Sequence, residues 1–322
     1  MKRGICLLVS IFVLCATSLF SAAAESYPER AITAYIPLPA GDTADIFVRT
    51  ITPYMEKFLG QPIVLVNKPG AGGSTAVSSL AGAKPDGYTM SWANLPTLVT
   101  LPQMRKLVYD AKKLVYIAAP MEFEYILYVA KDSPINSLKE LIATAKSKPD
   151  NIIYAVLGLG STNHLGVAWL ADKEGIQMKA VPFEGNPKAI SAVLGGHATA
   201  VNTSTTASVS PYKAGLIKPL VVMSSERIAF IPDTPTLREL GYDFSQYSCL
   251  GAVFPEGTPE AVRKRMEDAV RYAVEQNDVK QQAAEKLYAR IVFRTGGEYK
   301  ALCDKYWDIW GRVLEKVKLK TQ

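Results

Sequence analysis

Ser161 and His164 are the side chains whose types and spacing come nearest to a catalytic pair. They lie in VLGLGSTNHLG, residues 156–166, where a predicted strand passes through glycines into a predicted helix. Residues three apart on a helix are neighbours, so the hydroxyl could act as a nucleophile with the imidazole as its base. The stretch lacks the Gly-x-Ser-x-Gly pattern, however, and no third group to orient the imidazole is evident.

Two other interpretations of this stretch involve no bond-making. In the first, Ser161 or Thr162 caps the helix, and His164 packs or donates one hydrogen bond. In the second, free amides and hydroxyls of the turn form a receptor for an oxyanion. Alanine substitution separates these hypotheses, because only a catalytic pair would lose turnover when either side chain is removed.

A second strand-to-helix turn lies in IPLPAGDTADIF, residues 36–47. The free N–H groups at the start of its helix would favour an anion, yet Asp42 stands where an anion would bind. Asp42 has three interpretations: a plain helix N-cap, a ligand residue that accepts from an amine, amide or hydroxyl, or a cleft-edge residue that affects closure or encounter.

The glycine-rich stretch NKPGAGGST, residues 67–75, does not match a nucleotide-binding motif. Thr75 stands where a dinucleotide fingerprint needs glycine, and no Gly-Lys-Ser/Thr follows. A tight turn between strand and helix is predicted, with a small carboxylate at the helix N-terminus as the alternative. The sequence contains two histidines, so neither a histidine-based metal site nor a cofactor is predicted.

The N-terminus has the three-part pattern of a secretory signal peptide, predicted over residues 1–24. A retained membrane anchor is the alternative. Cleavage near Ala24 would leave an exported, periplasmic chain and would lower the formal charge from +6 to +4, because Lys2 and Arg3 are lost with no acid. The remaining charge forms no basic runs, which argues against nucleic-acid binding. The two cysteines left could form one disulfide or stay as buried thiols.

Short β-branched or aromatic runs alternate with helical patterns along most of the chain. This alternation predicts an α/β fold with mostly parallel sheets. Strands are expected in AITAYIP, PIVLVN, YTMSWAN, LVYIAA, EYILYVA, NIIYAV, KAVPF, ATAVNT and KPLVVMS, and helices over residues 46–58, 137–146, 162–173, 187–194 and 206–213. Ser137 and Glu140 predict a capping box, and Pro53 a kink or irregular turn.

Long helices dominate the last third, in residues 258–276 and 296–319. The second has an aromatic face at helical spacing, which is typical of a core-facing helix. We expect it to pack back on the N-terminal domain, which would make that domain discontinuous in sequence. The face comprises Tyr299, Leu302, Tyr306, Ile309, Trp310, Val313 and Val317.

An ordered series of motifs resembles the Bug-type extracytoplasmic solute receptors of the tripartite tricarboxylate transporter family. The series covers nearly the whole mature chain. It runs through YPERAITAYIPLPAGDTADI, LGQPIVLVNKPGAGGS, AKPDGYTM, SLKELIATAKSKPDNIIYAVLGLGSTNHL, VPFEGNPKAISAVLGGHATAV, YKAGLIKPLVVMSSER and IPDTPTLRELGY.

The resemblance implies a type II periplasmic binding protein fold, in which two α/β lobes close on a ligand in the cleft between them. It would divide the chain into lobe one over residues 25–127, lobe two over residues 128–222, and a return strand with the rest of lobe one over residues 223–322. It also implies a monomer that delivers a small organic acid or amphoteric carboxylate to membrane permease subunits. A sensory receptor for a membrane kinase is the alternative, and an exported hydrolase using Ser161 and His164 a further one.

In the family, backbone amides and hydroxyls at two turns hold the ligand carboxylates. These turns match residues 38–43 and 158–164 here, the two already marked by their free donors. Asn94 is added because open α/β sheets place ligands at strand C-terminal ends, and Thr203 because it matches an acidic family position. The predicted ligand-binding residues are Leu38, Ala40, Gly41, Asp42, Thr43, Asn94, Ser161, Thr162, Asn163, His164 and Thr203.

The sequence departs from the family pattern at three places. Asp42-Thr43 stands where Gly-Gly is usual, residues 182–185 read PFEG in place of PYKG, and residues 202–204 read NTS near the usual FDS. Two positions thus gain an acid and one loses an acid. An unpaired carboxylate buried beside a bound carboxylate is costly. Asp42 therefore either caps its helix or indicates a ligand that is not a simple polyanion.

Overall fold

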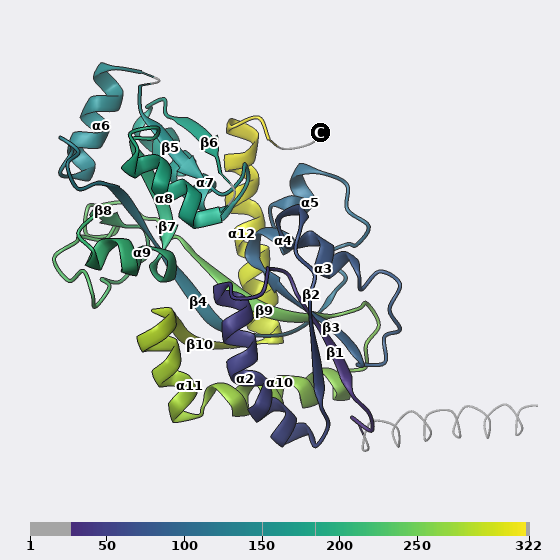
Figure 1. Cartoon of the computed structure of the whole chain (residues 1–322). Helices are drawn as coiled ribbons and strands as arrows, with labels where there is room; N and C mark the ends of the chain where they lie inside the picture. The colour runs from purple at the N-terminus through teal and green to yellow at the C-terminus, as the bar shows by residue number, and fades with distance from the viewer. Residues whose placement is uncertain (1–26, 150, 184, 320–322) are drawn as a thin grey trace, which may run out of the picture.

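The computed structural model describes residues 27–149, 151–183 and 185–319, in which strands and helices alternate along the chain (Figure 1). The predicted signal peptide lies outside these residues. The strands are β1 Ile32–Ile36, β2 Ile63–Asn67, β3 Thr89–Asn94, β4 Val115–Ala130, β5 Ile153–Val156, β6 Lys179–Pro182, β7 Ala200–Ser204, β8 Ile217–Val222, β9 Tyr247–Phe254 and β10 Arg290–Thr295. The α/β prediction is confirmed, but the expectation of mostly parallel sheets is wrong, because β4 pairs antiparallel with each of its neighbours and β9 pairs antiparallel with β3.

Helices connect these strands and cover both sides of the sheet. They are α2 Thr43–Leu59, α3 Ser74–Ser78, α4 Leu95–Leu98, α5 Leu101–Met104, α6 Leu138–Ser147, α7 Thr162–Glu174, α8 Gly185–Leu194, α9 Thr205–Lys213, α10 Glu260–Val274, α11 Asn277–Gln282 and α12 Gly296–Lys316. The helix α2 continues through Pro53, so the predicted irregular turn does not interrupt it. The predicted capping box of α6 is half present: Ser137 Oγ accepts from Glu140 N, but the Glu140 carboxylate accepts from the amide of Asn136.

The sheet follows the order β2-β1-β3-β9-β4-β7-β5-β6, with β8 and β10 also paired to β4. Two groups of strands are parallel: β1 with β2 and β3, and β5 with β6 and β7. The first group, with β9 and β10, forms what we call lobe one, and the second group, with β8, forms lobe two. Each lobe turns the C-terminal ends of its parallel strands to one edge, where ligands bind in such sheets.

One strand, β4, belongs to both lobes. The sequence predicts two strands here, LVYIAA and EYILYVA, but β4 is continuous, with register shifts where it passes Pro120. Residues 115–124 pair with β9, whereas residues 125–130 pair with β7 and β8. The change of partner falls at Tyr125, which places this residue where the lobes join. Neither β9 nor β10 is predicted by the sequence patterns.

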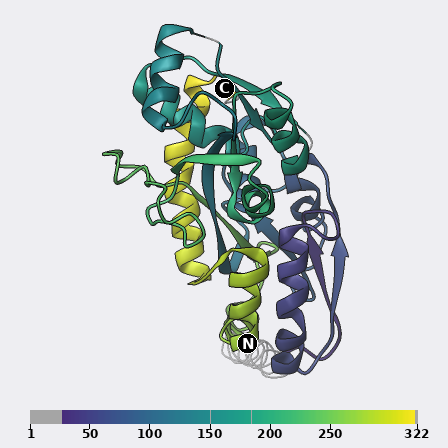
Figure 2. The same cartoon turned by 60° about the vertical axis from the view of Figure 1, so that its left-hand side comes forward.

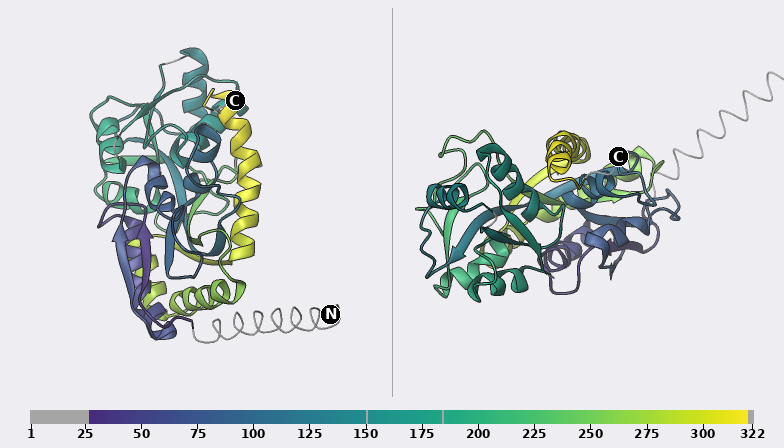
Figure 3. Two further views of the ribbon diagram at one scale, coloured as in Figure 1. Left: turned by 90° about the vertical axis from the view of Figure 1, so that its right-hand side faces the viewer. Right: turned by 90° about the horizontal axis from the view of Figure 1, so that it is seen from above.

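The C-terminal helices return to lobe one, as predicted. The helix α10 packs against α2 (Figure 1), and α11 also lies beside α2 (Figure 2). The helix α12 lies along one side of the molecule, against β4 and against α7 of lobe two (Figure 3). The expected face of α12 is buried at Tyr299, Leu302, Tyr306, Trp310 and Val313, while Ile309 and Val317 are partly buried. This helix therefore supports both lobes from behind the sheet.

A capping box starts α12. Thr295 Oγ1 accepts from Glu298 N at 3.3 Å, and a Glu298 carboxylate oxygen accepts from Thr295 N at 2.8 Å. We expect Thr295→Ala to lower the free energy of unfolding by about 1 kcal/mol, because an N-terminal amide loses its acceptor. Urea unfolding measures this change. Thr295→Ser keeps the hydroxyl and should stay near the parent value; equal losses in both variants would contradict a capping role.

Candidate functional site

The 38–43 turn connects β1 to α2. Carboxylates at the start of α2 accept hydrogen bonds from backbone amides in and next to this turn. Asp42 is the N-cap of α2: its Oδ1 accepts from Ala44 N at 3.3 Å. Asp45 Oδ2 accepts from Gly41 N at 2.9 Å, and the Asp42 N–H is bonded to Pro39 O at 3.2 Å. Asp42 thus caps α2, while a contact of its carboxylate with a ligand stays a prediction. The expectation of free donors in this turn is wrong for these three amides.

Asp45 is buried and stabilises the turn through hydrogen bonds. Its Oδ1 accepts from Arg49 Nε at 2.9 Å and from Asn67 Nδ2 at 2.8 Å. Burial acts to raise the pKa of Asp45, but the hydrogen bonds from Arg49, Asn67 and Gly41 together hold it below its ordinary value. Asn67 Nδ2 also donates to Leu38 O at 3.0 Å. The sequence analysis missed both Asp45 and Asn67.

The Asp42 carboxylate has no such support. Burial raises the pKa of Asp42, and the charge of Asp45 adds to the rise, while the amides of Ala44 and Thr43 oppose it. Among the residues that the structure describes, none forms a salt bridge with Asp42. Asp42 is therefore a half-buried acid whose charge is offset only by two backbone amides.

The 158–164 turn connects β5 to α7 and depends on glycine. Gly160 has φ of +79°, and a Cβ there would lie 2.0 Å from Met104 Sδ. The Gly160 carbonyl accepts from Thr100 Oγ1 at 2.9 Å. Met104 and Thr100 belong to the α4–α5 region of lobe one. The turn of lobe two is thus held in place by direct contact with lobe one.

Ser161 and His164 do not form a catalytic pair. Ser161 is the N-cap of α7: its Oγ accepts from the backbone N of His164 at 3.3 Å and donates to Gly158 O at 2.7 Å. The imidazole Nδ1 accepts from Gly160 N at 3.0 Å, and the ring stacks on Tyr154. The capping interpretation of Ser161 is confirmed, with one difference: the His164 ring nitrogen accepts a hydrogen bond, where a donor was expected.

Asn163 takes part in a buried network that links α7, β7 and the segment before β9. Asn163 Nδ2 donates to Asn202 O at 2.6 Å, and Asn202 Nδ2 donates to Asn163 O at 3.0 Å and to Gln246 Oε1 at 3.1 Å. Gln246 Nε2 donates in turn to Thr162 O. The side chain of Asn163 is therefore committed to structure. No local sequence pattern marks Asn202 or Gln246 as its partners.

The two secondary candidates lie at strand ends, as expected. Asn94 follows the core of β3 and caps α4, with its Oδ1 accepting from Thr97 N at 3.3 Å, and Thr203 donates its hydroxyl to Asn186 Oδ1 at 2.6 Å near the end of β7. Both residues thus share the sheet edges from which the two turns leave. Glu184, the second acid gained relative to the family pattern, lies outside the described residues.

Tyr125, where the lobes join, interacts electrostatically with residues of both turns. Burial raises the pKa of Tyr125 to about 12, hydrogen bonds with the side chains of Thr162 and Ser248 lower it, and the negative charge of Asp42 raises it. Thr162 begins α7, whereas Asp42 begins α2. One phenol on the shared strand therefore lies near the start of both helices. The sequence analysis missed Tyr125 because its position depends on how β4 pairs.

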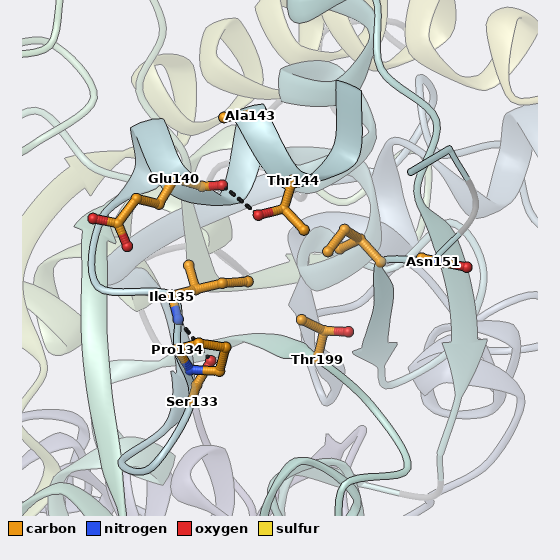
Figure 4. Close-up of a pocket in the computed structure, with 9 residues that line it drawn as sticks. Ser133, Pro134, Ile135, Glu140, Ala143, Thr144, Asn151 and Thr199 are labelled. Carbon is orange, nitrogen blue, oxygen red and sulfur yellow. Dashed lines mark hydrogen bonds between the residues drawn. The ribbon is translucent and has the colours of Figure 1, made fainter. Parts of the chain in front are cut away.

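A surface pocket lies elsewhere, between α6 and the start of β5 in lobe two (Figure 4). None of the predicted site residues lines it. Its polar groups are partly bonded to one another: Thr144 Oγ1 donates to Glu140 O at 2.8 Å, and Ile135 N donates to Ser133 Oγ at 3.2 Å. We therefore do not place the functional site there.

In the part of the chain that the structure describes, no His, Cys, Asp and Glu side chains gather in threes or more to hold a metal ion. Within the same ranges, no helix has the length and apolar character to cross a membrane. Cys249 and Cys303 are buried free thiols, which decides between the two states left open by the sequence.

Comparison with known proteins assigns the family. The family model described as the tripartite tricarboxylate transporter family receptor matches residues 47–319. The chain belongs to this family. It is 33% identical over 296 residues to a UPF0065 protein from the gbd 5' region of Cupriavidus necator, covering 88% of this chain and 90% of the relative. It is 30% identical over 254 residues to protein BugT of Bordetella pertussis, covering 78% of each.

Solved structures of periplasmic binding proteins share the fold. The periplasmic binding protein BugD superposes with a TM-score of 0.78 at 26% identity, covering 92% of this chain and 100% of that chain. MatC from Rhodopseudomonas palustris, with bound malate, gives 0.77 at 30%, covering 89% and 100%. An R. palustris protein with adipate gives 0.79 at 25%, covering 90% and 97%. The receptor thus has the periplasmic binding protein fold of two α/β lobes.

His164 makes the stability of the receptor depend on pH. Burial lowers its pKa from 6.5 to about 4, so between these values the unfolded chain binds more protons than the folded one. Stability is therefore lost as the pH falls through this window. Between pH 7 and pH 4.5 we expect the parent to lose about 2 kcal/mol more unfolding free energy than His164→Asn, as measured by urea unfolding. His197→Asn, at an exposed position, is the control; parallel pH profiles for parent and His164→Asn would contradict the prediction.

Gly166 leaves room for the buried amide network. A Cβ at this position would lie 1.9 Å from Gln246 Oε1. We expect Gly166→Ala to destabilise the receptor by about 2 kcal/mol, although alanine usually stabilises a helix relative to glycine. Gly297→Ala, where nothing lies within 4 Å, is the matched control and should be neutral or slightly stabilising. Thermal and urea unfolding measure both changes, and a stabilised Gly166→Ala would contradict this account of the network.

Proposed function

We propose that this receptor binds a small carboxylate-bearing molecule between its lobes and delivers it to the permease subunits of a tripartite transporter. The observation that carries the proposal is the position of the 158–164 turn at the junction of the lobes, where its Gly160 carbonyl accepts a hydrogen bond from Thr100 of lobe one and where β4 changes partner. Malate in MatC and adipate in the second R. palustris protein support a carboxylate ligand. The lobe boundaries expected from the sequence are part of this proposal, supported by the change of partner along β4 at Tyr125.

The carboxylate is assigned to the start of α7. Within the described part of the chain, no hydrogen bond reaches the amides of Thr162 and Asn163, and the helix dipole favours an anion there. The side chains of Ser161, Asn163 and His164 hold the turn, so these residues act by positioning its backbone. The remaining proposed contacts come from Leu38, Ala40, Gly41, Asp42, Thr43, Asn94 and Thr203.

Ligand binding is expected to raise the melting temperature of the receptor, because a ligand that binds only the folded state stabilises it. The test is a thermal-shift screen of dicarboxylates, tricarboxylates, aromatic acids and amino acids, followed by calorimetry of the hits. Closure can be followed by tryptophan fluorescence, since Trp169 of α7 stacks on Phe244, which contacts Trp310 of α12. The absence of any stabilising compound would overturn the proposal.

We also propose that the Thr162 hydroxyl, which lies beside Tyr125, forms one hydrogen bond with the ligand. Thr162→Val should then weaken binding of the ligand found in this screen about fivefold to tenfold, because one neutral hydrogen bond contributes about 1 kcal/mol. Isothermal calorimetry measures the change. Thr144→Val is the matched control, since Thr144 lies on α6 at the surface pocket and should leave affinity unchanged. Equal affinities for the parent and Thr162→Val would remove the Thr162 hydroxyl from the site.

A further inference from the structure

Most backbone positions at the 38–43 turn either lack an N–H group or use it in a hydrogen bond within the protein. The stretch IPLPAGD contains two prolines, which have no N–H. The amide of Gly41 is bonded to the Asp45 carboxylate and that of Ala44 to the Asp42 carboxylate. The amide of Asp42 is bonded within the turn as well. A carboxylate arriving here would thus find few free N–H groups.

Asp45 has a cationic partner, whereas Asp42 has none among the described residues. Asp45 is held by the guanidinium of Arg49 and by Asn67. Asp42 forms no salt bridge within the described ranges, and the amides of Ala44 and Thr43 use only part of the hydrogen-bonding capacity of its two oxygens. Its negative charge also raises the pKa of Tyr125, a residue of β4 where the lobes join.

The 158–164 turn of lobe two differs from the 38–43 turn in its charge and in its unbonded amides. Residues 158–164 contain no acid, and the amides of Thr162 and Asn163 are without partners in the described part of the chain. A second polar group without a partner lies next to the strand junction. Thr205 directly follows the residue that pairs with Tyr125, and its side chain is fully buried. Its hydroxyl has no hydrogen-bond partner among the described residues. In the described part of the chain, the start of α7 thus offers two amides without protein partners, and a buried hydroxyl without one follows the strand junction.

We propose that Asp42 sets the ligand class of this receptor: its carboxylate accepts a hydrogen bond from an ammonium or amide N–H at one end of a ligand whose other end is a carboxylate held at α7. This inference rests on the proposed function. A second carboxylate at the Asp42 end would face a like charge across a partly desolvated space, where repulsion is stronger than in water. A protonated amine there supplies the cation that Asp42 lacks.

Two ligand series that differ only at one end test this assignment. The four-carbon series is succinate, succinamate and 4-aminobutanoate, and the six-carbon series is adipate, adipamate and 6-aminohexanoate. Each keeps one carboxylate and replaces the other by an amide or an ammonium. Calorimetry and thermal shift on the mature receptor should show, in at least one series, the ammonium or amide member binding at least tenfold tighter than the dicarboxylate.

Asp42→Asn is the decisive variant, because asparagine keeps a side-chain oxygen for the cap and loses the charge. We expect it to bind the ammonium member at least tenfold more weakly and to bind the dicarboxylate equally well or better. Asp42→Ser, which also retains a capping oxygen, should show the same change. Asp132→Asn makes the same charge change at an exposed position of lobe two and should leave all affinities unchanged.

Failure of this inference is distinguishable from failure of the proposed function. If dicarboxylates bind more tightly than the ammonium and amide members and Asp42→Asn changes neither, Asp42 does not set the ligand class, while the carboxylate-receptor proposal stands. If neither these compounds nor any carboxylate of the broader screen binds, the proposed function fails and this inference fails with it.

Discussion

The hydrogen-bond ladder of β4 is the constraint on which the other features depend. Its first ten residues pair with β9, and its last six pair with β7 and β8, so one continuous strand fixes the register of both lobes. Buried backbone groups need partners, which leaves little freedom to shift this register. It places Tyr125 at the junction of the two lobes. The buried amides around Gln246 then tie the return segment to α7.

The two turns differ in the groups that accept hydrogen bonds from the first amides of their helices. Every helix begins with N–H groups that need acceptors. In α2 the acceptors are carboxylates of its own turn, Asp42 and Asp45, which bring negative charge to the site. In α7 the acceptor is the uncharged Ser161 hydroxyl, and two amides are left for an external group. The resulting electrostatic asymmetry suits a ligand that carries different groups at its two ends.

The elements that depend on neighbouring residues could be predicted from the sequence, whereas those that depend on distant residues could not. The strands β1 to β3 and β5 to β8, the helix α7 and the capping of α2 depend on neighbouring residues, and their patterns were recognisable. The strands β9 and β10 were missed because their partners on β4 are far along the chain, and β10 carries Arg290 and Arg294, whose ion pairs with Glu124 and Glu122 form only in the fold. Gln246 was missed for the same reason.

The sequence by itself determined the alternation of strands and helices, the two strand-to-helix turns, and the family, since each is encoded in residues close together or in an ordered series of motifs. Only the tertiary structure decided that the Ser161 hydroxyl and the His164 imidazole have different partners, that β4 is one strand, and that Tyr125 lies where the lobes join. The physical reason is that a hydroxyl, an imidazole or a carboxylate acts according to its partners, and these partners come from distant segments brought together by the sheet.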